Sequence, residues 1–179
     1  MKKQTALFGA LLLLVSISLS CSKRNDENAA PVIDEKNLTA CPLNANCQYL
    51  FTERADINPG HGNLITGNYR VFWSSVVNQG VNAVIYIKAP MTVKSFILKR
   101  EDIVGGKIEI SRSCPACLFA ASKLVDGYVK GINLSPDQPA DQTKWILEAQ
   151  IISESVYGAS PVRDTVTVKQ YFYPNFVYN

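Results

Sequence analysis

Two cysteines with a spacing that can support chemistry, Cys114 and Cys117, lie in the stretch SRSCPACLF. The C-x-x-C spacing occurs in thiol–disulfide oxidoreductases, as half of a zinc site, and as a short structural disulfide. Disulfides persist in oxidising compartments and are rare in the cytosol. The chemistry of this pair therefore depends on the compartment, and the N-terminal residues carry information about that.

The N-terminal residues have the pattern of an export signal. Lys2 and Lys3 precede an apolar run from Ala6 to Leu19. A transmembrane helix needs about 20 apolar residues, and this run is shorter. A positive head, a short apolar run and small residues at its end are typical of a secretory signal peptide. We therefore expect residues 1–20 to be removed during export.

The residue after this run, Cys21, points to lipidation. A cysteine directly after the apolar run resembles a bacterial lipoprotein signal, in which that cysteine carries lipid and becomes the mature N-terminus. Ser18 and Leu19 stand in the reverse of the usual order before it. The chain has five cysteines, so a lipidated Cys21 leaves four that can pair.

Residues 21–40 are polar and too poor in large apolar side chains to form a core, which predicts a flexible tether. A Cys-Ser start followed by acidic residues, here Asp26 and Glu27, resembles lipoproteins of the Bacteroidota. This resemblance implies an outer-membrane lipoprotein that reaches the membrane through its lipid anchor. Its domain would face the cell surface or the periplasm.

In an oxidising compartment the other four cysteines, Cys41, Cys47, Cys114 and Cys117, should form disulfides. Cys114 and Cys117 can lie at most about 10 Å apart, whereas Cys41 and Cys47 can lie up to about 20 Å apart. Crossed pairing would need these separations to match. We therefore predict the local pairs 41–47 and 114–117, with no metal bound. Thiol–disulfide activity at Cys114 and Cys117 remains the alternative.

The elements that must position these cysteines are strands. Apolar and polar residues alternate with a period of two, as in the stretch KWILEAQI, and turn-forming residues separate the runs. The alternation predicts strands near 46–53, 66–77, 81–89, 93–100, 107–112, 127–134, 143–153 and 162–173. The one helix candidate is residues 116–125.

This pattern predicts a single antiparallel all-β domain, residues 41–179, with about eight strands and at most one short helix. Such a domain can close as an up-and-down barrel of the lipocalin type or pack as a β-sandwich. Trp73 and Trp145 each follow the alternation of a long strand. We expect both to face inward and to meet across the core. The alternative is that one of them faces outward as a binding platform.

Composition and motifs limit the function. The chain has 18 Lys and Arg against 15 Asp and Glu, without a basic cluster of the kind that binds nucleic acid. His61 is the only histidine, and no nucleophile elbow or phosphate-binding loop occurs. We therefore predict no catalytic residue and no cofactor. The aromatic C-terminus offers candidates to face a ligand: Tyr171, Tyr173, Phe176 and Tyr178.

We thus expect a non-enzymatic binding or structural module of the envelope. Its partner would be a glycan, a small hydrophobic ligand or another envelope protein. The alternative is an envelope enzyme, acting on glycans or through Cys114 and Cys117.

Overall fold

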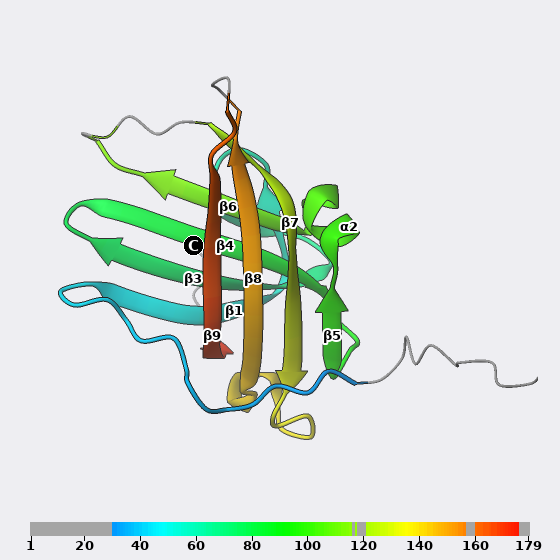
Figure 1. Ribbon diagram of the computed structural model, residues 1–179. Coiled ribbons are helices and arrows are strands. Elements are labelled where there is room, and N and C mark those ends of the chain that lie inside the picture. The colour runs from blue at the N-terminus through cyan, green and yellow to red at the C-terminus, as the bar shows by residue number, and fades with distance from the viewer. Residues whose placement is uncertain (1–29, 116, 118–120, 157–159, 176–179) are drawn as a thin grey trace, which may run out of the picture.

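The computed structural model describes residues 30–115, 117, 121–156 and 160–175, and they form one curled, mostly antiparallel β-sheet (Figure 1). The hydrogen-bonded order is β5-β7-β8-β9-β1-β3-β4-β6, and β2 pairs with β1 alone. The predicted all-β class is confirmed. The strands are β1 (Asn46–Asn58), β2 (Asn63–Thr66), β3 (Tyr69–Asn78), β4 (Val81–Pro90), β5 (Ser95–Leu98), β6 (Ile108–Ser113), β7 (Ser122–Asn133), β8 (Trp145–Ser155) and β9 (Arg163–Pro174).

The sheet has two antiparallel halves, a first half of β1, β3, β4 and β6 and a second half of β5, β7, β8 and β9. A parallel pairing of β1 with β9 joins them, with Leu50 opposite Tyr173. The strands of the two halves run at a steep angle to each other, so the sheet curls into a half-barrel (Figure 1).

The edge strands β5 and β6 are consecutive along the chain and do not pair with each other in the described sheet. Between them lie a short helix, α2 (Arg100–Asp102), and a helical turn, η1 (Ile103–Lys107). Ile103 is buried and belongs to the main core. The helical segment thus covers the gap that a closed barrel would fill with hydrogen bonds between strands.

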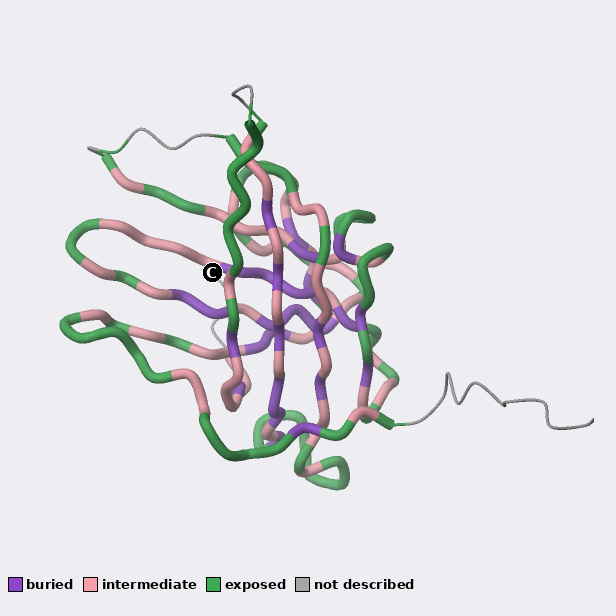
Figure 2. The backbone as a smooth tube through the Cα atoms, viewed as in Figure 1, coloured by how far each residue is buried: buried purple, intermediate pink, exposed green. Residues whose placement is uncertain are grey.

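The main core lies between the two halves, where buried stretches of both meet (Figure 2). Phe72 is at its centre, with ring contacts to four aromatic side chains: Phe51, Phe96, Trp145 and Phe172. The predicted inward face of β8 is confirmed, since Trp145, Leu147, Ala149 and Ile151 are all buried in this core.

The prediction for the other tryptophan is wrong. Trp73 lies on the opposite face of β3 from Phe72, in a second cluster with Val71 and Tyr86. Both faces of β3 carry large apolar side chains, because the second half covers one face and the β1–β2 hairpin covers the other. Alternation alone therefore could not tell which face is the main core.

The predicted helix at 116–125 is also wrong over its last four residues, which belong to β7. There Leu124 pairs with Ser153 of β8. The extended antiparallel pairing of these two strands outweighs the local helix propensity. Residues 116 and 118–120 lie outside the described part of the chain.

The end of the segment predicted as a tether is bound to β9. The backbone N–H of Thr39 donates to the carbonyl of Lys169, and the N–H of Lys169 donates to Thr39 Oγ1, both at 2.8 Å. The Tyr171 hydroxyl donates to a carboxylate oxygen of Glu35. Ile33 is buried.

No helix within the described residues is long and apolar enough to cross a membrane.

Candidate functional site

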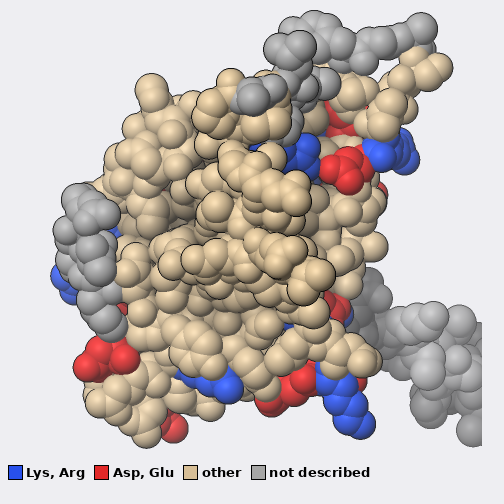
Figure 3. Space-filling view, turned by 90° about the vertical axis from the view of Figure 1, so that its left-hand side faces the viewer, with Lys and Arg blue, Asp and Glu red and all other residues tan. Residues whose placement is uncertain are grey.

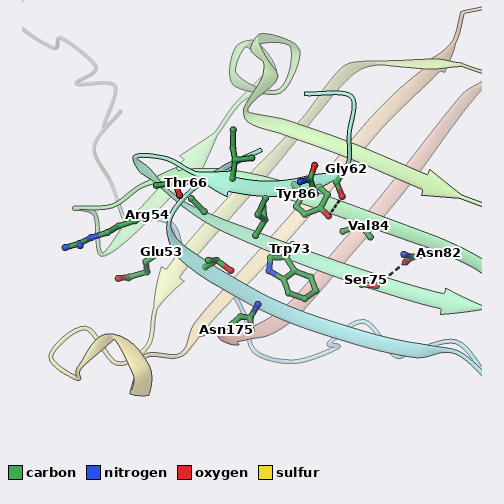
Figure 4. A pocket seen from close by; sticks show the side chains of 15 residues that line it. Glu53, Arg54, Gly62, Thr66, Trp73, Ser75, Asn82, Val84, Tyr86 and Asn175 are labelled. Carbon is green, nitrogen blue, oxygen red and sulfur yellow. Dashed lines mark hydrogen bonds between the residues drawn. The ribbon is translucent and has the colours of Figure 1, made fainter. Parts of the chain in front are cut away.

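A cleft of about 800 Å³ lies on the outer face of the first half, between strands β1, β3 and β4 and the hairpin formed by β1 and β2. Figure 4 shows Trp73 and Tyr86 in the middle of it, with Glu53 and Arg54 at one end and Ser75 and Asn82 at the other. The lining residues are Thr52, Glu53, Arg54, Ala55, Gly62, Asn63, Leu64, Ile65, Thr66, Trp73, Ser75, Asn82, Val84, Tyr86 and Asn175.

The roof of the cleft is a hairpin of residues 55–66, which we call the flap. It starts at a β-bulge, where the pairing of β1 with β3 shifts between Thr52 and Ala55. Arg54, inside the bulge, has a left-handed backbone with φ of 53°. A bulge bends its strand and re-aims the side chains beside it. From Ala55 onward β1 therefore pairs with β2 and folds over the sheet.

Contacts with β4 and β6 hold the flap on the sheet, among them an ion pair of Asp56 with Lys88 at 3.2 Å. The Tyr86 hydroxyl donates to the carbonyl of Gly62 at 2.7 Å. A Cβ on Gly62 would lie 2.4 Å from Ser111 Oγ, so the flap approaches β6 as closely as a glycine allows. Burial, and secondarily the charge of Glu109, raises the pKa of Tyr86 above its ordinary value. The phenol therefore keeps the proton that it donates.

The floor of the cleft contains two polar groups without a hydrogen-bond partner. Five buried side-chain polar atoms of the described residues lack one, and two of these, Thr52 Oγ1 and Trp73 Nε1, belong to residues that line the cleft. Thr52 is only 8% exposed. Leaving a buried donor or acceptor unpaired costs about 1–3 kcal/mol. Two residues of the cleft lining thus each contain an enclosed polar atom that the described protein groups leave without a partner.

The strand register places a row of large side chains across the outer face. Tyr173, Leu50, Trp73 and Tyr86 are successive partners on β9, β1, β3 and β4. Partners in a sheet project from the same face. Tyr173 is 48% exposed at the open end of this row. Asn175 lines the cleft beyond it, and its backbone N–H donates to the carbonyl of Phe51 at 2.8 Å.

The cleft lining has one acidic and one basic side chain, Glu53 and Arg54. Arg70 holds Glu53 from the core side, with its Nη2 and Nε 2.6 Å and 3.1 Å from Glu53 Oε1. The carboxylate charge is thus compensated by a guanidinium that is itself 8% exposed. The remaining polar lining residues are neutral.

The structure joins the four described cysteines in the local pairs that the spacing predicts. Cys41 bonds to Cys47 with Cα atoms 5.9 Å apart, and Cys114 bonds to Cys117 at 5.2 Å. None of these residues lines the cleft. Cys21 lies outside the described residues.

The aromatic residues predicted to face a ligand have different surroundings. Tyr173 is open to solvent beside the cleft. Tyr171 contacts Glu35 through its hydroxyl, and Lys144 Nζ lies 3.5 Å from its ring centroid. Phe176 and Tyr178 lie outside the described part of the chain. His61 is exposed in the turn of the flap.

Thr52 and Tyr86 were not predicted as site residues, and Trp73 was one only in the alternative that a tryptophan faces outward as a binding platform. One signal was available: β3 has large side chains on both faces, so something other than the second half had to cover Trp73. The turn sequence NPGHGN after β1 could have been recognised as the tip of that cover.

One face of the molecule has few charged side chains at its centre. In the face shown in Figure 3, the Lys, Arg, Asp and Glu side chains of the described residues lie around the margin, and the centre has none. Within the same part of the chain, no group of His, Cys, Asp and Glu is arranged to hold a metal ion.

No protein-family model, curated protein or solved structure matches this chain.

Proposed function

We propose that this protein is a lipid-anchored protein of the bacterial envelope whose β domain binds a ligand in the outer cleft without transforming it. The export-type N-terminus, the cysteine at position 21 and the two disulfides support an extracytoplasmic location. The lipid on Cys21 would hold the domain at the outer membrane.

The observation that carries the binding function is the unused hydrogen-bonding capacity on the cleft floor. Native proteins leave few buried polar groups without partners. Thr52 Oγ1 and Trp73 Nε1 belong to two residues that line the cleft, whose hairpin roof is bonded to Tyr86 at Gly62. A ligand with hydroxyl or carbonyl groups would satisfy both.

The cleft residues favour binding over catalysis. Hydrolysis of glycosides normally needs two carboxyl groups across the scissile bond. Glu53 is the single carboxylate of the lining, and its Oε1 already accepts hydrogen bonds from Arg70. The four described cysteines are in disulfides, which leaves none of them as a thiol nucleophile.

The test uses the two tryptophan indole N–H signals in an NMR spectrum of the ¹⁵N-labelled protein, since the chain has two tryptophans. The protein is titrated with the soluble low-molecular-weight and glycan fraction of the native host's envelope. The Trp73 signal, assigned with a Trp73→Phe variant, should shift while the Trp145 signal stays in place. A folded spectrum in which neither signal moves would refute binding in the cleft.

A further inference from the structure

The geometry points to a neutral saccharide chain as the ligand, with its terminal sugar under the flap and the following sugars along the row from Trp73 to Tyr173. This inference rests on the proposed binding function and names the class of ligand. It is derived from the extent of the site, the chemistry of its faces and its charge.

The site is elongated. The row from Tyr86 to Tyr173 crosses three strand spacings, or about 14 Å. The flap covers the Tyr86 end, where Tyr86 is bonded to Gly62. Tyr173 at the other end is open. The site thus suits an elongated ligand that enters end-on beneath the flap and continues across the strands.

The second feature of the site is the chemistry of its aromatic side chains. Trp73 lines the cleft as a partly buried ring, Tyr86 is buried beside it, and Tyr173 continues their row as an exposed ring. The face of an aromatic ring carries partial negative charge and attracts polarised C–H groups. A pyranose ring has such C–H groups on its faces and hydroxyls around its edge. One kind of ligand can therefore contact the rings and the polar lining together.

The third feature is the polar lining. Hydroxyls and side-chain amides both donate and accept hydrogen bonds, as sugar hydroxyls do. Ser75 Oγ and Asn82 Oδ1 are already 3.2 Å apart at one end of the cleft, which leaves the Asn82 amide nitrogen for a ligand oxygen. The neutral polar side chains of the lining are Thr52, Asn63, Thr66, Ser75, Asn82 and Asn175.

The same lining disfavours the two other ligand classes. An apolar ligand would remove water from the neutral polar side chains of the lining, such as Asn82, without replacing its hydrogen bonds, at a cost that a sugar avoids. An acidic chain would carry a negative charge on each sugar, whereas the lining offers one cation, Arg54, because Arg70 already compensates the Glu53 carboxylate. A neutral polyhydroxyl ligand meets neither penalty.

The test measures binding of neutral oligosaccharides of increasing length, built from glucose, mannose or xylose, by calorimetry and by the Trp73 indole signal. Two further probes are an oligogalacturonate, which is acidic, and 1-aminoanthracene, which is apolar. We expect at least one neutral series to bind and to shift the Trp73 signal. The affinity should rise with length until the chain spans the row.

Two tyrosine variants test the row. Tyr173→Ala should weaken binding of the longest oligosaccharide a few-fold to about tenfold and leave the shortest unchanged. The matched control is Tyr128→Ala in the second half, because Tyr128 is also partly exposed but pairs with Gln150 of β8, outside the row from Tyr86 to Tyr173. That variant should bind like the parent at every length.

The outcomes separate this inference from the proposed function. If no neutral series binds while oligogalacturonate, 1-aminoanthracene or the envelope fraction shifts the Trp73 signal, the assignment to a neutral saccharide is wrong and the cleft remains a binding site. If no probe and no envelope fraction moves that signal, both are wrong. If Tyr173→Ala and Tyr128→Ala behave alike, the ligand does not extend along the row.

Discussion

The guanidinium carbon of Arg70 lies 4.7 Å from the ring centroid of Trp145, so a cation from the first half of the sheet stacks on an aromatic ring of the second half. Arg70 also donates to Glu53, whose side chain belongs to the lining of the outer cleft. The core and the cleft therefore share one ion pair, and changes to it should affect both.

Arg70→Met should lower the free energy of unfolding by about 3–5 kcal/mol, because it leaves Glu53 as a partly buried charge without its partner. Adding Glu53→Gln should restore part of that loss. The matched control is Lys94→Met, whose ion pair with Asp137 is exposed and should be worth less than about 1 kcal/mol. Urea titration measures all three variants. Equal midpoints for Arg70→Met and Lys94→Met would contradict this account.

Replacing each tryptophan should change the free energy of unfolding by a different amount. Trp145 is fully buried among Phe72 and Phe96, so Trp145→Ala should cost about 3–5 kcal/mol. Trp73→Phe should cost less than about 1.5 kcal/mol, because Trp73 is only partly buried and phenylalanine keeps an aromatic ring. Urea midpoints separate the two. A Trp145→Ala midpoint near that of the parent would show that this side chain does not stabilise the core.

The Cys114–Cys117 disulfide should be structural. Its loop is short, so its loss in a Cys114→Ser, Cys117→Ser variant should cost about 2 kcal/mol or less on the chain-entropy model. The variant should stay folded, and the parent protein should not catalyse insulin reduction. A reduction rate well above background that disappears in Cys114→Ser would instead establish a redox role.

Lipidation predicts where the protein partitions. Cys21→Ala should move the protein from the membrane to the soluble fraction, because stable anchoring needs more than one acyl chain and the variant would have none. Fractionation followed by immunoblotting measures this. Complete retention in the membrane fraction would rule out the lipid as the anchor.

The helical segment between the sheet edges should respond to acid through Asp102. Burial raises the pKa of Asp102. Hydrogen bonds from Lys107 Nζ and from the backbone N–H of Lys99 lower it, as do the charges of both lysines. These lowering effects are larger together, so the pKa of Asp102 lies below its ordinary value. A carboxyl group whose pKa is lowered in the folded state stabilises the protein at pH values above its unfolded pKa, which is about 4. This contribution is lost as the pH falls through the pKa of the folded state.

Asp102→Asn should therefore be less stable than the parent at neutral pH, and the difference should shrink as the pH falls below about 4. Thermal unfolding measured across this pH range tests the expectation. Asp137→Asn serves as the control, because its side chain is 89% exposed and its partner Lys94 is also exposed. A difference between Asp102→Asn and the parent that did not change with pH would exclude the carboxylate charge as the cause.

Much of the fold could be predicted from the sequence, because local patterns determine it. Alternation over Trp145 to Ile151 marks a strand with one buried face, whatever that face packs on. The short spacing of Cys114 and Cys117 limits them to a local disulfide. All eight predicted strands are present, and among the described residues the four-residue β2 of the flap is the one strand that was missed.

The cleft was decided by tertiary structure. Trp73 and Phe72 are adjacent residues on opposite faces of β3, and only the placement of the flap and the second half shows which face is the core and which is the cleft. Tyr173 joins the row only because β9 pairs with β1 in parallel. Such pairings join segments far apart in the chain, so the local pattern of hydrophobic residues carries no record of them.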